Sequence, residues 1–524
     1  MSKKTLPIGK QSFRNLIEEN CVYVDKTEYI YRLATEGFYY FLSRPRRFGK
    51  SLLVSTLKEL FMGSRELFEG LWIEDKWDWT KKRPVVHISF AEMPYQGLGL
   101  DKAISLELDK NAELFSIELK SEDIKSKFKE LLVKLTAQYG KVVVLIDEYD
   151  KPIIDFLDKT KIHKAKEHRE ILKAFYSVLK DSEEYLKFVL ITGVSKFSQV
   201  SIFSDLNHLD DISIDRRYAL MLGYTQVELE HYFKEYLLAT AKHMGISLKA
   251  LLKQMKDWYN GYSWDNKITL YNPFGVLNFF AKQEFRNFWF ATGTPTFLTD
   301  LMVEQTDFDF ENINTNISRI EKYDLEDLDL TAILFQTGYL TIKKKNIFNG
   351  DILLDYPNRE IRESMYAFML DSLKKRQNRE SGHAIVKDMA LAFQRNNLER
   401  VRDLMEGMFG DLPENLYETD DRRSERFYHS FIHLTFKFLG IFIKSEVATA
   451  RGYADSVVET PTHIYLFEFK HQSTAEAAMQ QLLDKNYAQK YASVNKTIVG
   501  IGVNFDKKKR IIEGWEVRIL KEKE

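Results

Sequence analysis

Residues Arg44 to Ser51 read RPRRFGKS, and the last three of them match the end of a phosphate-binding loop. In such a loop the backbone N–H groups at a helix N-terminus surround the phosphates, a lysine neutralises their oxygens, and a hydroxyl holds Mg²⁺. Gly49, Lys50 and Ser51 stand in these positions. The consensus G-x-x-x-x-G-K-[S/T] begins with a glycine, but that place is taken by Arg44. The sequence therefore predicts a nucleotide site whose loop lacks its first glycine.

A second group of polar residues follows two apolar runs further along the chain. Asp147 and Glu148 come directly after VVVLI, and Thr192 and Ser195 end the run FVLITGVS. An aspartate at a strand end can hold Mg²⁺ through water, and the adjacent glutamate can orient the attacking water. We therefore expect Ser51 and Asp147 to serve as metal ligands. For Thr192 and Ser195 two interpretations stay open, since these hydroxyls can sense the γ-phosphate or cap a turn.

The loop also carries three arginines, Arg44, Arg46 and Arg47. Guanidinium groups form paired hydrogen bonds with phosphate oxygens and could offset the missing glycine. The alternative is a solvated turn without a role in binding. We predict that Arg46 and Arg47 contact the nucleotide.

A third group lies near the C-terminus, in the stretch ADSVVETPTHIYLFEFK. Glu468 and Lys470 are two residues apart on a predicted strand, so they share one face, and Phe467 and Phe469 share the other. Asp455 begins the neighbouring strand and can approach the same face. Two carboxylates beside a lysine can bind a divalent cation and stabilise the charge that develops on a phosphodiester. The competing interpretation is an ordinary salt-bridged strand end.

The surrounding elements must position these residues. Short apolar strands at 37–43, 83–90, 141–150 and 188–192 alternate with amphipathic helices, which predicts an α/β fold with a mostly parallel, P-loop NTPase-like sheet. From residue 224 the pattern becomes helical and resembles a lid. Around Asn349-Gly350 it reads helix, strand, turn, strand, helix, which indicates a winged-helix-like region or a structural spacer. We predict three parts, residues 1–223, 224–400 and 401–524.

Composition limits the class of protein. The chain has 524 residues with 76 Lys and Arg against 77 Asp and Glu, so any contact with nucleic acid must come from a local basic patch. Its one cysteine, Cys21, excludes internal disulfides. No apolar run approaches the ~20 residues that cross a bilayer, and no signal-peptide pattern opens the chain. We expect a soluble cytoplasmic protein that does not bind membranes, with oligomerisation left open.

Several segments resemble those of bacterial AAA-ATPase-like proteins that carry a C-terminal PD-(D/E)xK nuclease-like domain. They are LPIGKQSFRNLIEENCVYVDKTEYIYRL, RPRRFGKSLL, VVVLIDEYDKPI and ITGVSKFS. The resemblance covers nearly the whole chain. It implies that RPRRFGKS is the usual form of the loop in this family, so that Arg44 is a family trait. It also implies a small restriction-endonuclease-like α/β domain at the C-terminus.

The resemblance adds residues to the third group. It implies that Asp455, Glu468 and Lys470 form the catalytic set, that Glu446 is a further acid of the site, and that Gln480 faces the metal from the following helix. One departure is Tyr453, which stands where the family usually has arginine.

These observations favour an ATP-dependent, Mg²⁺-requiring nuclease that acts on nucleic acid, with DNA favoured, and in which the ATPase acts as a switch. Two alternatives remain. In one, the nuclease-like domain of a nucleotide-gated signalling or scaffold protein binds nucleic acid or a partner without cutting. In the other, the chain is an ATPase of mobile-element or phage-defence biology. ATP and Mg²⁺ are the expected cofactors.

Overall fold

The computed structural model describes most of the chain, and it places two compact units along it. The described residues are 4–158, 160–196, 203, 208–290, 298, 301–302, 309–321, 328–373, 381–410, 421–447, 455–471, 473–506 and 511–523, with side chains left out at 421–429 and 446–447. The first unit comprises Met1–Phe297 and Phe310–Ile361, and the second comprises Leu298–Asp309 and Arg362–Glu524. The finer boundaries after residues 223 and 400 stay predictions.

The first unit is built on a five-stranded parallel sheet with the order β2-β3-β4-β1-β5. Its strands are β1 (Tyr39–Ser43), β2 (Val85–Ser89), β3 (Val142–Asp147), β4 (Leu186–Gly193) and β5 (Asp210–Asp211). The strands β1, β3 and β4 are buried almost throughout, as their unbroken apolar runs predict. Because the strands are parallel, their carboxyl ends and the loops that carry the polar groups lie at one edge of the sheet.

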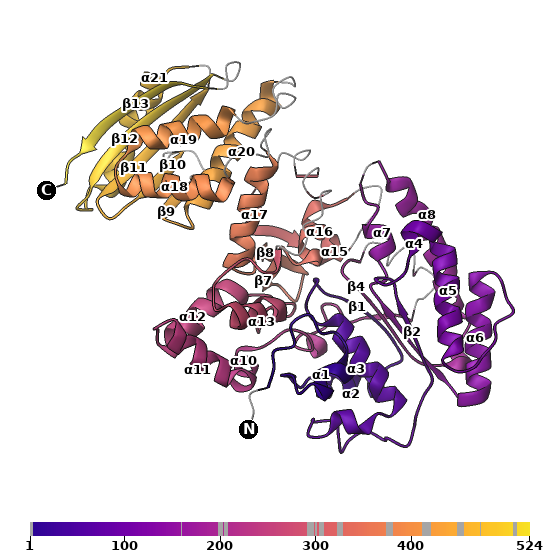
Figure 1. Ribbon diagram of the computed structural model, residues 1–524. Coiled ribbons are helices and arrows are strands. Elements are labelled where there is room, and N and C mark those ends of the chain that lie inside the picture. The colour runs from indigo at the N-terminus through magenta and orange to yellow at the C-terminus, as the bar shows by residue number, and fades with distance from the viewer. Residues whose placement is uncertain are drawn as a thin grey trace. The chain divides into compact units, whose positions relative to one another are not determined.

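Helices cover both faces of this sheet (Figure 1). On one face lie α1 (Phe13–Glu18), α2 (Thr27–Glu36) and α3 (Lys50–Met62), whose apolar side chains share a core with β1, β3 and β4. The other side carries α5 (Leu100–Glu113), α6 (Ile124–Tyr139) and α8 (Ile162–Lys180), with the short helices α4 (Tyr95–Leu98) and α7 (Lys151–Ile154) near the sheet edge. The predicted α/β class is confirmed.

A helical bundle follows the sheet within the first unit. It consists of α10 (Gln226–Tyr232), α11 (Lys234–His243), α12 (Leu248–Tyr259) and α13 (Pro273–Lys282). These helices bury a separate apolar core that also takes in Val22 and Val24 from the N-terminal segment. Thr225 and Glu228 form a capping box at the start of α10. The N-terminal segment therefore ties the bundle to the rest of the unit.

The winged-helix-like region has the predicted order of elements. Helix α16 (Leu330–Thr337) leads into β7 (Thr341–Lys345), a turn at Asn349-Gly350, β8 (Asp351–Asp355) and α17 (Arg359–Ser372). A third strand, β6 (Ile313–Asn316), and the short helix α15 (Ile317–Glu321) precede them. The sheet order is β6-β8-β7. Helix α17 begins in the first unit and continues into the second.

The second unit contains a five-stranded mixed sheet with the order β13-β12-β11-β10-β9. Its strands are β9 (Lys444–Val447), β10 (Ser456–Glu459), β11 (His463–His471), β12 (Thr497–Asp506) and β13 (Ile511–Lys521). Strands β11 and β12 are parallel and are joined through α21 (Ala475–Asp484), which packs on the sheet over an apolar cluster. Helices α18 (Gly382–Gln394), α19 (Leu398–Gly410) and α20 (Asp421–Leu439) complete the unit. This is the small α/β domain that the sequence predicts.

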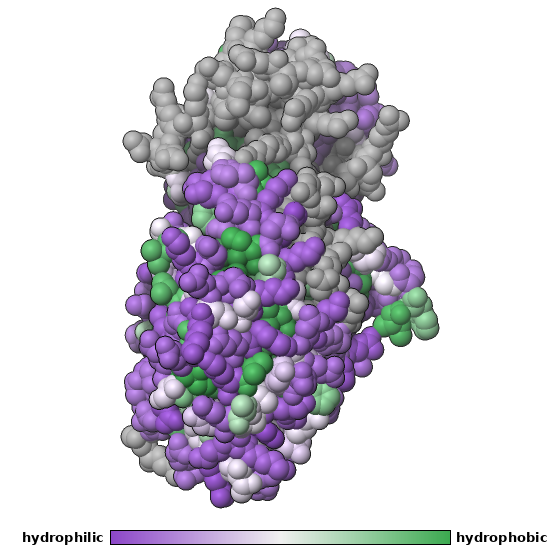
Figure 2. All heavy atoms as spheres, turned by 90° about the vertical axis from the view of Figure 1, so that its right-hand side faces the viewer, coloured by the Kyte–Doolittle hydropathy of each residue, from purple (hydrophilic) through white to green (hydrophobic). Residues whose placement is uncertain are grey.

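The molecular surface shown in Figure 2 is dominated by hydrophilic residues, with hydrophobic ones scattered singly or in small groups. Among the described residues, no helix has both the length and the apolar character needed to cross a membrane.

Candidate functional site

The loop after β1 needs no glycine at its first position. The backbone N–H of Arg44 donates to the carbonyl oxygen of Gly193 at 3.2 Å, so Arg44 continues the pairing of β1 with β4. The left-handed conformations lie later in the loop, at Arg47 (φ 65°) and Gly49 (φ 98°). The strain of a non-glycine residue there, about 1 kcal/mol or more, falls on Arg47 instead of Arg44. The missing glycine is thus no obstacle to a phosphate-binding loop.

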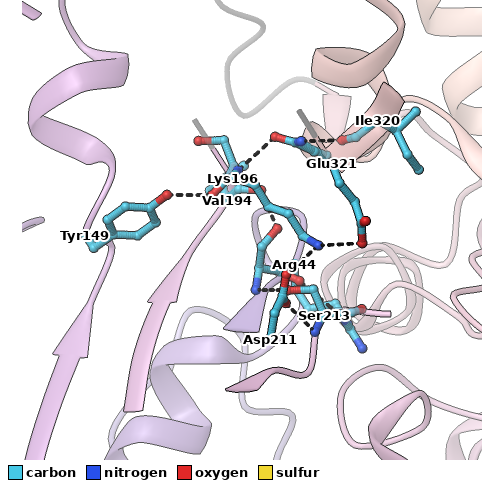
Figure 3. A network of polar contacts seen from close by, with 11 residues as sticks. Arg44, Tyr149, Val194, Lys196, Asp211, Ser213, Ile320 and Glu321 are labelled. Carbon is cyan, nitrogen blue, oxygen red and sulfur yellow. Dashed lines mark hydrogen bonds and ion pairs between the residues drawn. The ribbon is translucent and has the colours of Figure 1, made fainter. Parts of the chain in front are cut away.

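The side chain of Arg44 does not line the pocket beside the loop and belongs instead to the network of polar contacts drawn in Figure 3. It is 1% exposed, its Nη1 donates to the carbonyl oxygens of Ser43 and Ser213, and its guanidinium lies 4.3 Å from the ring centroid of Trp264. Burial lowers the pKa of Arg44 to about 9, while the nearby carboxylate of Asp211 opposes that shift. Both interpretations of Arg44, a phosphate clamp and a solvated turn, are wrong, because the side chain is a buried structural cation.

A pocket of about 420 Å³ lies over the remainder of the loop. Six of the predicted residues line it, namely Arg46, Arg47, Gly49, Lys50, Ser51 and Glu148. The guanidinium of Arg47 lies 5.1 Å from the ring centroid of Phe274, a residue of α13 that also lines the pocket. The bundle therefore contributes one wall of the pocket, in keeping with the predicted lid.

Lys50 is held by its own loop. Its Nζ donates to the carbonyl oxygens of Arg44 at 2.8 Å and of Pro45 at 3.0 Å, and the residue is 6% exposed. Burial lowers its pKa, and the negative charges of Asp147 and Glu148 oppose that effect. A buried cation that has only neutral acceptors gains strongly when an anion replaces them. Lys50 is therefore suited to exchange the two carbonyls for phosphate oxygens.

Asp147 and Thr192 are not among the residues that line the pocket. The Thr192 hydroxyl, which is fully buried, donates to Asp147 Oδ1 at 2.5 Å, and Asp147 is 4% exposed. Thr192 therefore positions Asp147 in this structure, and its predicted contact with the nucleotide stays a prediction. The metal-binding role of Asp147 stays a prediction. The Ser195 hydroxyl donates to Asp150 Oδ2 at 2.6 Å, a contact with the segment after β3, and its role as a phosphate sensor stays a prediction.

Glu148 combines an unusual backbone with a perturbed carboxyl. Its φ is 54°, a left-handed conformation that costs a non-glycine residue about 1 kcal/mol or more. Burial raises its pKa, and Lys50 opposes that shift. Strained backbone and a raised carboxyl pKa together are common at sites of acid–base chemistry. The predicted role in orienting water is compatible with this geometry.

Sequence reasoning missed several pocket residues. Asp150 lines the pocket, is 1% exposed, and accepts hydrogen bonds from the backbone N–H groups of Val194 and Ser195; burial raises its pKa. The acid-rich ending DEYD offered a signal for it. The N-terminal segment and the bundle gave no such signal, yet they contribute Pro7, Gly9, Lys10, Gln11, Tyr224 and Phe274.

In the second unit, the strand register brings Asp455 and Glu468 together. Ser456 pairs with Phe467, so the preceding residue, Asp455, lies opposite Glu468 on the same face. Asp455 Oδ2 accepts a hydrogen bond from the N–H of Phe469 at 2.9 Å, which fixes the carboxylate at this strand end. Lys470 Nζ lies 3.4 Å from Glu468 Oε1. The three residues of the predicted set are thus neighbours.

Glu468 is 2% exposed, and its Oε2 is buried without a hydrogen-bond partner among the described residues. Burial raises its pKa to about 7, Asp455 adds to the shift, and Lys470 opposes it. An unsatisfied buried carboxylate oxygen beside a second carboxylate fits a cation ligand. In the described part of the chain no group of three or more His, Cys, Asp or Glu residues is placed to hold a metal, so these two carboxylates are the candidate ligands.

Gln481, rather than Gln480, belongs to this site. Its Nε2 donates to Glu468 Oε1 and its Oε1 accepts from Lys470 Nζ at 2.5 Å. Gln480 points elsewhere and donates to Asp484 at 2.7 Å on the exposed side of α21. The prediction for Gln480 is wrong by one residue, which on a helix is a turn of about 100°.

The contact between α21 and the sheet explains which glutamine faces Glu468. Gly502 of β12 is the register partner of Glu468, and a Cβ built on it would lie 2.4 Å from the carbonyl oxygen of Ala475 in α21. The helix therefore packs directly on this glycine. The backbone of Glu446 pairs with Val457, whereas its side chain, like the whole of Tyr453, lies outside the described residues.

Comparison with known proteins identifies both domains. A family model described as a predicted AAA-ATPase matches residues 7–203, and one for the PD-(D/E)XK nuclease superfamily matches residues 423–515. The chain is 39% identical over 533 residues to an "Uncharacterized protein in vnfD 5'region" of Azotobacter chroococcum mcd 1, covering 99% of this chain and 100% of the relative. A solved structure of the Aeropyrum pernix ORC1 protein in complex with DNA matches with a TM-score of 0.25 and 11% identity over 69% of this chain and 93% of that one. The chain belongs to the family of AAA-ATPase-like proteins whose C-terminal domain is of the PD-(D/E)XK nuclease superfamily.

Proposed function

We propose that the chain binds and hydrolyses ATP in the loop pocket, and that the nucleotide controls divalent-metal-dependent cleavage of nucleic acid at Asp455, Glu468 and Lys470. The observation that carries this proposal is a buried charged group in each unit, Lys50 and Glu468, that the described residues leave without a counter-ion or without a hydrogen-bond partner. Lys50 is a buried cation with only carbonyl acceptors, and Glu468 has a buried carboxylate oxygen without a partner among the described residues. Lys50 fits the phosphate of a nucleotide, and Glu468 fits a divalent cation.

In the loop pocket, the chain's own residues would bind the triphosphate and position water. Lys50 would exchange its loop carbonyls for phosphate oxygens, and Arg46 and Arg47 would contact the remaining phosphate charge. Ser51 and Asp147 would hold Mg²⁺, which neutralises the charge that develops on the phosphate oxygens. Glu148 would orient the attacking water.

In the second unit, Asp455 and Glu468 would hold a divalent cation, which polarises the phosphodiester and activates water. Lys470 would stabilise the charge that develops on the phosphate oxygens, and the same ammonium is already positioned by Gln481. Gln481 would also orient Glu468, so that the oxygen without a partner is the one left for the cation.

Control by the nucleotide would begin at the loop. The two carbonyls that hold Lys50 belong to Arg44 and Pro45, and Pro45 packs so closely on Gly338 that a Cβ there would lie 2.6 Å from it. The next carbonyl, of Arg46, accepts from Trp289. Releasing Lys50 toward phosphate would therefore act on a segment that Trp289 and the winged-helix-like region contact.

Trp289 also contacts helix α17. The backbone N–H of Trp289 donates to Glu360 Oε1 at 2.6 Å, and Glu360 lies in the first turn of α17, which continues into the second unit. A coupling free energy of ~1 to 3 kcal/mol between nucleotide and cleavage would change the cleavage rate about 5- to 150-fold.

The test is the nicking of supercoiled plasmid with Mg²⁺, with and without ATP, by the wild type and by Lys470→Ala. Metal-dependent nicking that requires Lys470 and responds to ATP is the expected result. Binding of DNA without metal-dependent nicking would instead favour the interpretation in which the nuclease-like domain binds without cutting. Nicking that Lys470→Ala retains would contradict the assignment of the site.

A further inference from the structure

The turn between β7 and β8 exposes two large apolar side chains. Phe348 is 93% exposed and Ile347 is 60% exposed, and both lie at the tip of the hairpin. Single exposed apolar residues are normal on protein surfaces, but a nearly fully exposed phenylalanine beside an isoleucine at a hairpin tip is the kind of feature that marks an interaction site.

The tip that carries these side chains is held in place. Asn346 pairs with Asp351 through its N–H at 2.8 Å, and its side chain accepts from the N–H of Phe348 at 2.9 Å. Asn316 of β6 donates to the carbonyl oxygen of Asn349 at 2.9 Å and to Asp351 at 3.0 Å. Because these bonds fix the turn, Phe348 is presented to solvent by a preorganised backbone, which reduces the entropy lost on binding.

Exposed cations lie at the base of the hairpin. Strand β7 ends in three consecutive lysines, of which Lys344 is exposed, and Arg216 on the neighbouring segment is exposed as well. Burial and then the positive charge of Arg216 lower the pKa of Lys345, and the carboxylates of Glu321 and Asp265 oppose that shift, so Lys345 has charged neighbours of both signs. Asp210 and Asp215 pair with Arg217, and among the described residues no ion pair holds Lys344 or Arg216.

We propose that the tip of the β7–β8 hairpin binds nucleic acid, with Phe348 stacking on a base and Lys344 contacting the backbone phosphates. An aromatic ring and adjacent cations fit the two surfaces that a nucleic acid presents, the faces of its bases and its phosphates. The ring either stacks on an unpaired base or inserts between two stacked base pairs of a duplex. This inference rests on the proposed function, since it supplies the surface that holds the strand to be cut.

The test measures binding without cleavage. A labelled single strand of DNA and the matching duplex serve as probes, and their fluorescence anisotropy is measured in EDTA. The full-length Lys470→Ala chain is titrated into each probe. The same titration is repeated with chains that carry Phe348→Ala, Phe348→Tyr or Val227→Ala in addition. Val227 is 77% exposed on α10 and serves as the matched control. Phe348→Ala is expected to weaken binding about 5-fold or more, while Phe348→Tyr and Val227→Ala retain it. Tighter binding of the single strand would indicate stacking on an unpaired base, and tighter binding of the duplex would indicate insertion between base pairs.

Lys344→Ala supplies a second measurement. Loss of one phosphate contact should lower the slope of log affinity against log salt by about 1. Equal affinities and salt slopes in all variants would overturn the inference, and so would Phe348-dependent binding of phosphatidylserine vesicles with unchanged binding of nucleic acid. These outcomes can be told apart from a failure of the proposed function. If nicking depends on Lys470 but binding does not depend on Phe348, only this inference fails. If binding depends on Phe348 but no nicking occurs, only the proposed cleavage fails.

Discussion

The indole Nε1 of Trp289 donates a 2.9 Å hydrogen bond to the carbonyl oxygen of Arg46. Arg46 lines the nucleotide pocket, and the backbone N–H of Trp289 donates in turn to Glu360 at the start of α17. One residue thus connects the phosphate-binding loop with the helix that leads into the second unit. Nucleotide binding in the pocket can shift α17 only through contacts that differ between two arrangements, such as the bonds from Trp289 to Arg46 and Glu360.

Replacement of Trp289 by phenylalanine should separate nucleotide binding from control of cleavage. The ring remains, but the donor to Arg46 is lost and a carbonyl oxygen loses its partner, at a cost of about 1 to 3 kcal/mol. We expect Trp289→Phe to bind a labelled ATP analogue within a few-fold of wild type and to nick plasmid at rates that no longer depend on nucleotide. Nicking measured with ATP, with ADP and without nucleotide tests this expectation.

The matched control for that variant is Trp79→Phe. Trp79 makes a comparable bond, from its Nε1 to the carbonyl oxygen of Glu74 at 2.8 Å, and it does not line the pocket. An equal loss of nucleotide control in both variants would assign the effect to general destabilisation rather than to the contact with Arg46.

Lys50→Ala should abolish ATP binding. The variant removes the ammonium that would exchange carbonyl oxygens for phosphate oxygens, and charge-assisted hydrogen bonds to phosphate are among the strongest in proteins. Lys58→Ala, on the same helix but outside the pocket, should bind normally. Unchanged affinity of Lys50→Ala for a labelled ATP analogue would remove Lys50 from the site.

The sequence predicts the elements of this molecule better than its side-chain orientations. The order of strands and helices follows from hydrophobic periodicity, and the register of Asp455 and Glu468 follows from alternation along two strands. Arg44 was misjudged because its position in the loop motif carries no information on Trp264, which is distant in sequence but stacks on its guanidinium. The sequence does not distinguish Gln480 from Gln481 because helical phase depends on how α21 packs on Gly502, a tertiary contact. Trp289 gave no signal, since its partner is a backbone carbonyl.

Glu360 should make stability depend on pH. Burial raises its pKa to about 8, and the backbone N–H groups of Trp289 and Phe290 oppose that shift. Between the ordinary carboxyl pKa and about 8 the folded chain holds a proton that the unfolded chain releases. The free energy of unfolding therefore falls as pH rises through this window, by up to about 1.4 kcal/mol per pH unit, and levels off above it.

Glu360→Gln tests this titration because the amide keeps an acceptor for the N–H of Trp289 but cannot ionise. We expect the variant to lose the negative slope and to exceed wild type in stability at the alkaline end of the window. Denaturant unfolding across about pH 5 to 8 measures the difference, with the exposed Glu122→Gln as control. Parallel pH profiles of wild type and Glu360→Gln would contradict a buried, proton-holding Glu360.

The adjacent glutamines of α21 offer the sharpest test of the second site. Gln481 orients Glu468 and Lys470, whereas Gln480 bonds to Asp484 on the outer side of the helix. Gln481→Ala should therefore weaken Mn²⁺ binding about 10-fold or more, because the ligand Glu468 loses the group that positions it. Asp455→Asn should weaken it further by removing a ligand, and Gln480→Ala should leave it unchanged. Calorimetric titration of Mn²⁺ into the three variants decides the matter: identical binding by Asp455→Asn and wild type would refute shared ligation by Asp455 and Glu468, and equal effects of the two glutamine variants would refute the placement of Gln481.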